Sequence, residues 1–340
     1  MRELRAVSLV AASLALAFPA SASADEVWVP PEGGAVSEDI AAADGRLVYV
    51  GSLGPGPLGL IEGFGAEARR LPVPEAVEGS GIFGLDLGTD AGGRPVAVYE
   101  YSRPSEPSRL WRYDFSSGRA RVMPVARKGC RLSNPHLERG VLYFVRYVRG
   151  ARQGCRPGIH QRRPGEPVRR LTTRAYHDFD VSGRVIAFVR DRVLRRGDIS
   201  EGKWSELGFS HVYLLRPGQR QPGLVASAGY RANPRWEDFG GAAFGGVSLD
   251  DGYVYWLRLN YDTGERDLLR ARANEWDPDV STLSAQGRAL PHPSPGAFPA
   301  DGFAVDGDRI YYDSVDYNPV TGSYGRSAIA RVTPLPPVFE

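Results

Sequence analysis

Polar side chains recur at one position of a repeated sequence pattern. Each of the glycines at 45, 93, 140, 183, 252 and 307 precedes an apolar run that is rich in β-branched and aromatic residues. Six positions before these glycines, with a one-residue insertion at the doubled Gly92-Gly93, lie Asp39, Asp86, Asn134, His177, Gly246 and Asp301. Convergent carboxylates would bind a cation or an amine, since like charges in one site favour a counter-ion. The alternative is that these residues only cap strand ends around a solvated central channel, of the kind that the repeat described below would enclose.

The motifs that identify common catalytic centres are missing. The sequence has no G-x-S-x-G elbow and no H-E-x-x-H. We therefore assign no catalytic residue and no metal ligand. His136 and His177 begin neighbouring predicted inner strands, but two isolated histidines are more often hydrogen-bonded structural residues. We expect no cofactor, and a divalent cation at the channel mouth stays open as an alternative.

Aromatic residues lie in the longest insertions between predicted strands, at 191–209, 226–246, 259–266 and 314–326. The aromatic residues that we expect to bind a ligand are Trp204, Trp236, Tyr261 and Tyr317. Exposed aromatic side chains on loops are typical anchors for a partner or a sugar. The alternative is that they fold inward and hold the long loops in place.

The repeat predicts the elements that position these residues. Successive turn glycines are separated by 48, 47, 43, 69 and 55 residues. A period of roughly 40 to 55 residues with strand-type content predicts a β-propeller with one four-stranded sheet per repeat. In the second repeat, for example, strands are expected at 96–99, 108–115 and 119–125. A β-sandwich would instead show turns every 8 to 12 residues without the longer period.

The sixth repeat lacks a fourth strand. Its third strand is expected at 327–332, and the prolines at 334, 336 and 337 suit a paired strand poorly. The segment 26–29 is an extra strand before the first repeat. We therefore predict that the N-terminal strand completes the sixth blade and closes the ring, which would remove the exposed sheet edges.

The N-terminus has the pattern of a secretory signal peptide. Arg2 and Arg5 precede an apolar stretch, and Ala22-Ser23-Ala24 is a small-residue cleavage site. We expect residues 1–24 to be a signal peptide and 25–340 to be one propeller domain. The absence of a nearby cysteine argues against a lipid anchor, so we expect a secreted or extracytoplasmic protein. An uncleaved membrane anchor is the alternative.

The net charge and the cysteine content narrow the class of protein further. The formal net charge is only +2, which gives no basic excess for nucleic acid. The basic residues are almost all Arg, a bias that we interpret as bacterial high-GC coding. The two cysteines, Cys130 and Cys155, are expected to form a disulfide in an exported protein. We expect a monomer without a membrane span after cleavage.

Residues 168–192 resemble a TolB-type propeller repeat, in which an R-R-L-T outer strand precedes a D-G-R-x-I-A-F-x-S hairpin. The matching segments are Arg169-Arg170-Leu171-Thr172 and Ser182-Gly183-Arg184-Val185-Ile186-Ala187-Phe188. The resemblance implies a six-bladed propeller in an exported protein, and it implies no particular activity. Our leading hypothesis is a non-catalytic scaffold that binds a protein, a small polar ligand or a glycan on the face of the loops between second and third strands. The alternative is a propeller hydrolase or lyase that acts on a carbohydrate or lactone at the channel mouth.

Overall fold

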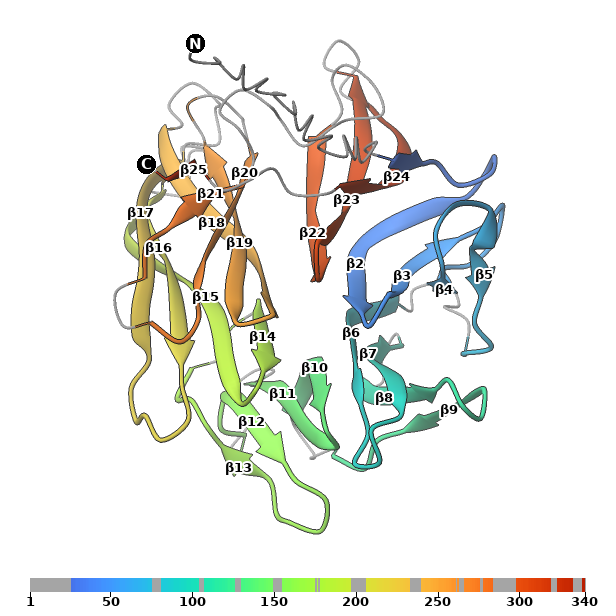
Figure 1. The fold of residues 1–340 in the computed structure, drawn as a ribbon, viewed down its shortest axis with the longest axis horizontal. Helices are drawn as coiled ribbons and strands as arrows, with labels where there is room; N and C mark the ends of the chain where they lie inside the picture. Colours follow the sequence, from blue (N-terminus) through green and yellow to red (C-terminus); the bar gives the residue numbers. More distant parts are fainter. Residues whose placement is uncertain are drawn as a thin grey trace, which may run out of the picture.

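The part of the protein that the structure describes is built almost entirely of antiparallel β-strands (Figure 1). The structure is a computed structural model, and it describes residues 26–74, 81–103, 107–125, 130–148, 155–174, 176, 178–196, 206–232, 240–260, 262, 266–275, 278–283, 298–318, 323–332 and 338–339. Within these ranges the helical content is one 3₁₀ turn, Gly65–Glu67. No helix among them is long and apolar enough to cross a membrane. The predicted signal peptide lies outside the described residues.

Three four-stranded sheets follow one another along the first half of the chain, each in sequential strand order. The first contains β2 (Ala35–Ala43), β3 (Arg46–Ser52), β4 (Gly59–Glu62) and β5 (Arg69–Arg70). The second contains β6 (Gly81–Thr89), β7 (Pro95–Ser102), β8 (Arg109–Asp114) and β9 (Arg119–Val122). The third contains β10 (Cys130–Glu138), β11 (Val141–Val148), β12 (Gly158–Arg162) and β13 (Arg169–Arg170). Each glycine turn of the sequence pattern joins the first two strands of its sheet.

The next eight strands form one continuous sheet, where the sequence pattern predicted two separate sheets. Its first half contains β14 (Phe179–Ser182), β15 (Val185–Arg196), β16 (Glu206–Leu215) and β17 (Gly223–Ala232). Its second half contains β18 (Gly240–Asp250), β19 (Tyr253–Asn260), β20 (Arg266–Arg272) and β21 (Ser281–Thr282), with β25 (Val338–Phe339) paired to β21. The two halves join through β17 and β18, where Tyr230 lies opposite Gly241.

The last sheet combines strands from both ends of the chain. Its order is β1 (Glu26–Trp28), β24 (Ser323–Val332), β23 (Arg309–Asn318) and β22 (Phe298–Asp306). Val27 lies opposite Ala330, so the N-terminal segment pairs beside 327–332 as the sequence predicts. In Figure 1, β22 lies beside β2. The Gly45 amide of the β2–β3 turn donates a hydrogen bond of 2.7 Å to Asp306 Oδ2.

Apolar side chains fill the space between neighbouring sheets. One cluster joins Ile40 and Tyr49 of the first sheet to Ala304 and Ile329 of the last. Similar clusters join the first sheet to the second and the second to the third. Because burial of apolar surface is the main favourable term in folding, these clusters hold the inner strands at fixed positions.

The predicted disulfide is present, with Cys130 at the start of β10 bonded to Cys155 just before β12.

The predicted long loops differ from the structure. Much of 191–209, 226–246 and 314–326 continues as strand in β15 to β18, β23 and β24. The strands of these hairpins continue past the residues that the glycine pattern covers. Boundaries taken from that pattern therefore end the strands too early.

Candidate functional site

Several innermost strands carry a β-bulge at a similar point. The pairing register shifts between Phe83 and Asp86 in β6, between Ser133 and His136 in β10, and between Gly245 and Val247 in β18. A bulge adds one unpaired residue and redirects the side chains beside it.

The bulge residues have left-handed backbone conformations. Gly84, Asn134 and Gly246 have φ of 56°, 44° and 55°. This conformation favours glycine, and asparagine tolerates it better than most other residues. Two positions after them lie Asp86, His136 and Ser248. The bulges therefore place polar residues at equivalent points of three inner strands.

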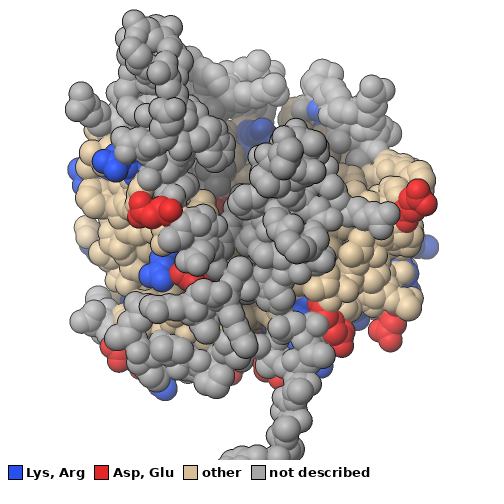
Figure 2. Space-filling view, turned by 90° about the horizontal axis from the view of Figure 1, so that it is seen from above, with Lys and Arg blue, Asp and Glu red and all other residues tan. Residues whose placement is uncertain are grey.

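These strands surround a central cavity of about 320 Å³. Of its described lining residues, seven are aspartates: Asp39, Asp44, Asp86, Asp178, Asp180, Asp250 and Asp306. None of the described lining residues is Lys or Arg. On the side seen in Figure 2, by contrast, the described acidic and basic side chains are intermingled. The negative charge of the cavity is therefore a local feature of a nearly neutral chain.

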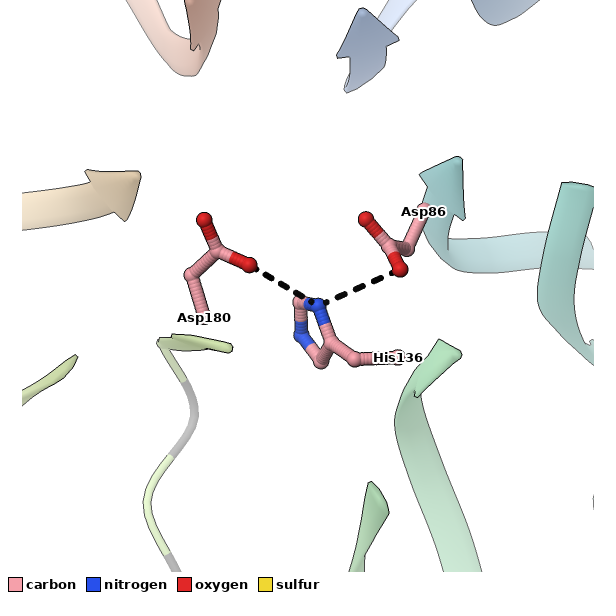
Figure 3. A group of neighbouring side chains, drawn as sticks. All are labelled: Asp86, His136 and Asp180. Atoms are coloured by element: carbon pink, nitrogen blue, oxygen red, sulfur yellow. Dashed lines mark ion pairs between the residues drawn. The ribbon is translucent and has the colours of Figure 1, made fainter. Parts of the chain in front are cut away.

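Asp86, His136 and Asp180 meet within this cavity (Figure 3). His136 Nδ1 lies 3.2 Å from Asp180 Oδ1 and 3.5 Å from Asp86 Oδ2. One potential ligand atom from each residue lies within 4.8 Å of the other two. The three residues come from β6, β10 and β14, so three consecutive inner strands each supply one group.

Backbone contacts fix the two carboxylates. The Leu137 amide donates to Asp86 Oδ2 at 3.2 Å, and the Leu249 amide donates to Asp180 Oδ2 at 2.6 Å. Each aspartate thereby bonds to an inner strand other than its own. The His136 ring lies edge-on to Phe179, with ring centroids 4.3 Å apart. These contacts leave the three groups little freedom to move apart.

The electrostatic environment couples the three groups. Burial lowers the pKa of His136, but the charges of Asp86 and Asp180 and contacts with them outweigh this effect and raise the pKa to about 10. Burial raises the pKa of Asp86, although His136 opposes that shift. Without another cation, His136 is the positive partner of two carboxylates.

The structure places three of the predicted channel residues, Asp39, Asp86 and Asn134, on this cavity. His177 and the side chain of Asp301 lie outside the described residues. So do Trp204, Trp236, Tyr261 and the side chain of Tyr317, although Tyr317 itself lies within β23. Their grouping on one face stays a prediction.

His136 and Asp180 are not in the predicted channel set, because that set is defined by a count of six residues back from each turn glycine. The bulges shift the register, so the position that aligns with Asp86 in β10 is His136 and not Asn134. A signal was available: His136 follows Asn134-Pro135, and proline inside a strand is typical of a bulge.

Searches against protein-family models and against curated proteins find no match. Among solved structures, TolB from Acinetobacter baumannii is 13% identical with a TM-score of 0.44, over 85% of this chain and 64% of that chain. A Mycobacterium tuberculosis puromycin-hydrolyzing peptidase is 14% identical with a TM-score of 0.42, and the match covers 89% of this chain and 52% of the peptidase. The β-propeller domain of the Trilobed protease from Pyrococcus furiosus is 13% identical with a TM-score of 0.43, and the match covers 88% of this chain and 95% of that domain.

This chain therefore spans about half of the peptidase and less than two thirds of TolB. All three TM-scores are below 0.5, and we take neither an activity nor a partner from them.

Proposed function

We propose that the chain is a single closed six-bladed β-propeller over residues 25–340. The three N-terminal sheets would be blades 1 to 3, and the two halves of the continuous sheet would be blades 4 and 5. Strands β22 to β24 with β1 would form blade 6. Two contacts between the chain ends support closure: the β1–β24 pairing and the Gly45–Asp306 hydrogen bond.

The function that we propose is non-catalytic binding outside the cytoplasm, with the central channel as the ligand site. The observation that carries this proposal is the cavity with seven aspartates and no described Lys or Arg in its lining. A cavity of about 320 Å³ is at the lower end of the usual range for ligand sites. We therefore propose that the ligand inserts a compact cationic group, such as the amine of a small molecule or of a partner protein.

Burial makes this charge pattern effective. Burial disfavours the ionised form of Asp250 and raises its pKa. Carboxylates that are partly removed from water attract a counter-ion more strongly than exposed ones do. The Cys130–Cys155 disulfide supports an oxidising compartment and therefore the proposed export.

Titration with putrescine, a small diamine, would test the proposal. We expect saturable binding by calorimetry that weakens as salt rises, because salt screens the interaction. The double variant Asp39→Asn with Asp250→Asn should bind several-fold more weakly. Asparagine keeps the oxygen that accepts from Gly84 at Asp39 and from Gly307 at Asp250, so the fold should be retained.

A matched control is Asp308→Asn, which removes one exposed carboxylate that does not line the cavity. It should bind putrescine as the original chain does. No saturable binding at low ionic strength would overturn the proposal. Equal weakening by the cavity variant and the control would also overturn it, because the effect would then be general surface charge.

An enzyme is the second candidate, and the Asp86–His136–Asp180 cluster favours it because carboxylate and imidazole groups can transfer protons. The substrate class that we consider is a carbohydrate or a lactone. Turnover of a lactone panel that is lost in Asp180→Asn would favour the enzyme. We propose that any ligand enters from the face of the loops between second and third strands, where the predicted aromatic residues lie.

A further inference from the structure

We infer that Asp86, His136 and Asp180 form a site for one divalent first-row transition-metal ion, of the Zn²⁺ or Mn²⁺ class. This inference deepens the proposed function, because it rests on the channel being a cation site and names the ion that one cluster of its lining would hold. It concerns one cluster within the larger aspartate-lined cavity.

The spacing of the three groups fits a shared ion. In a tetrahedral site with bonds of about 2.1 Å, ligand atoms lie about 3.4 Å from one another. The separations from His136 Nδ1 are 3.2 Å to Asp180 Oδ1 and 3.5 Å to Asp86 Oδ2. Two of the three separations therefore match a shared ion, and the third, between the two carboxylates, lies within 4.8 Å.

The histidine supplies an independent observation. His136 Nδ1 is buried, and neither carboxylate contact has the geometry of a hydrogen bond. Buried nitrogen atoms normally have a hydrogen-bond partner, and a bound metal ion would satisfy this one. Nδ1 is also the ring atom that faces both carboxylates (Figure 3).

The donor set selects the class of ion. Imidazole together with carboxylate suits zinc and other first-row transition metals, whereas Ca²⁺ and Mg²⁺ prefer oxygen ligands alone. Three protein ligands leave at least one position open to the cavity. The ion would therefore stay accessible to a ligand in the channel.

Backbone amides already hold both aspartates in place, through the Asp180 oxygen that is not the one nearest His136 and through the same Asp86 oxygen that faces His136. Asp86 Oδ2 and Asp180 Oδ2 accept from the Leu137 and Leu249 amides, and the ring of His136 packs on Phe179. Partners of this kind orient metal ligands and strengthen binding. The competing arrangement is a protonated His136 that pairs with both carboxylates and holds three sheets together without a metal.

Calorimetry with Zn²⁺ on the purified, tag-free chain distinguishes these arrangements. We expect one ion per chain. His136→Asn should lower the affinity by more than the roughly 10- to 100-fold that loss of an outer partner of a metal ligand costs, and so should Asp180→Asn. His211→Asn is the matched control, because His211 lies on β16 outside the cavity and should not affect binding. Ca²⁺ at the same concentration should not displace Zn²⁺.

The same proteins titrated with putrescine separate the two proposals. Putrescine binding without stoichiometric Zn²⁺ binding would overturn the metal site and leave the channel proposal standing. If the original chain binds neither putrescine nor Zn²⁺, both the channel proposal and the metal site are overturned. Zn²⁺ binding that survives His136→Asn would overturn the assignment, because the ion would then lie elsewhere.

If the variants fail to fold, X-ray absorption of the Zn²⁺-loaded original chain answers the question directly. We expect one imidazole nitrogen with oxygen ligands completing the shell. A shell without imidazole, or with two, would overturn the site.

Discussion

Truncation of Trp28 tests whether the N-terminal strand holds the two ends of the chain together. Trp28 belongs to β1, lies opposite Ile329 of β24 and packs against the cluster shared by the first and last sheets. Its ring lies edge-on to Tyr49, with centroids 5.8 Å apart. Trp28→Ala therefore removes apolar contacts with both sheets at once.

The expected loss follows from partial burial. Truncating a fully buried Trp or Phe to Ala typically costs about 3 to 5 kcal/mol, and an aromatic pair contributes about 1 kcal/mol of its own. Trp28 is half-buried, so we expect a loss of about 2 kcal/mol. For a domain of this size, that corresponds to a fall in Tm of about 5 °C.

Val27→Ala is the matched control on the same strand. Val27 points the other way and is 37% exposed, so its truncation should cost under about 1 kcal/mol. Urea unfolding followed by far-UV circular dichroism measures both variants without relying on Trp fluorescence. Equal effects of the two substitutions, or no effect of Trp28→Ala, would refute the reasoning.

Three further predictions follow from other parts of the chain. Gly88→Ala should destabilise strongly, because a Cβ there would overlap a backbone oxygen of β10, whereas Gly245→Ala, with open space around it, should change Tm little. Hydrogen bonds from Arg94 and other neighbours lower the pKa of Asp90, so its stabilisation is present above pH 4 and is lost on acidification; the Tm difference between the original chain and Asp90→Asn should shrink as pH falls. Reduction of the Cys130–Cys155 bond, which spans 25 residues, should cost roughly 3 kcal/mol in chemical unfolding.

The sequence predicted the order of strands well, because the glycine turns and apolar runs are local signals. Pairing of the N-terminal strand beside 327–332 also followed from the pattern, since a missing fourth strand requires a replacement. The continuous pairing of β17 with β18 did not follow from the sequence pattern, because it depends on contacts between two hairpins.

The candidate site was predicted less completely. Asp39, Asp86 and Asn134 were identified from their place before a turn, but His136 and Asp180 were not. In β6 and β10 a bulge decides which side chain faces the cavity and changes the count from the turn glycine, whereas β14 carries Asp180 in a strand that pairs with β15 without a register shift. That register is set by the packing of neighbouring sheets, which a count along one strand does not include.

The most direct test of the account is an anomalous difference map from crystals of the tag-free chain soaked in Mn²⁺. The account predicts one strong peak in the central channel, within coordination distance of Asp86 Oδ2, His136 Nδ1 and Asp180 Oδ1. A channel without a peak at full soaking concentration, or a peak only on the outer surface, would contradict it.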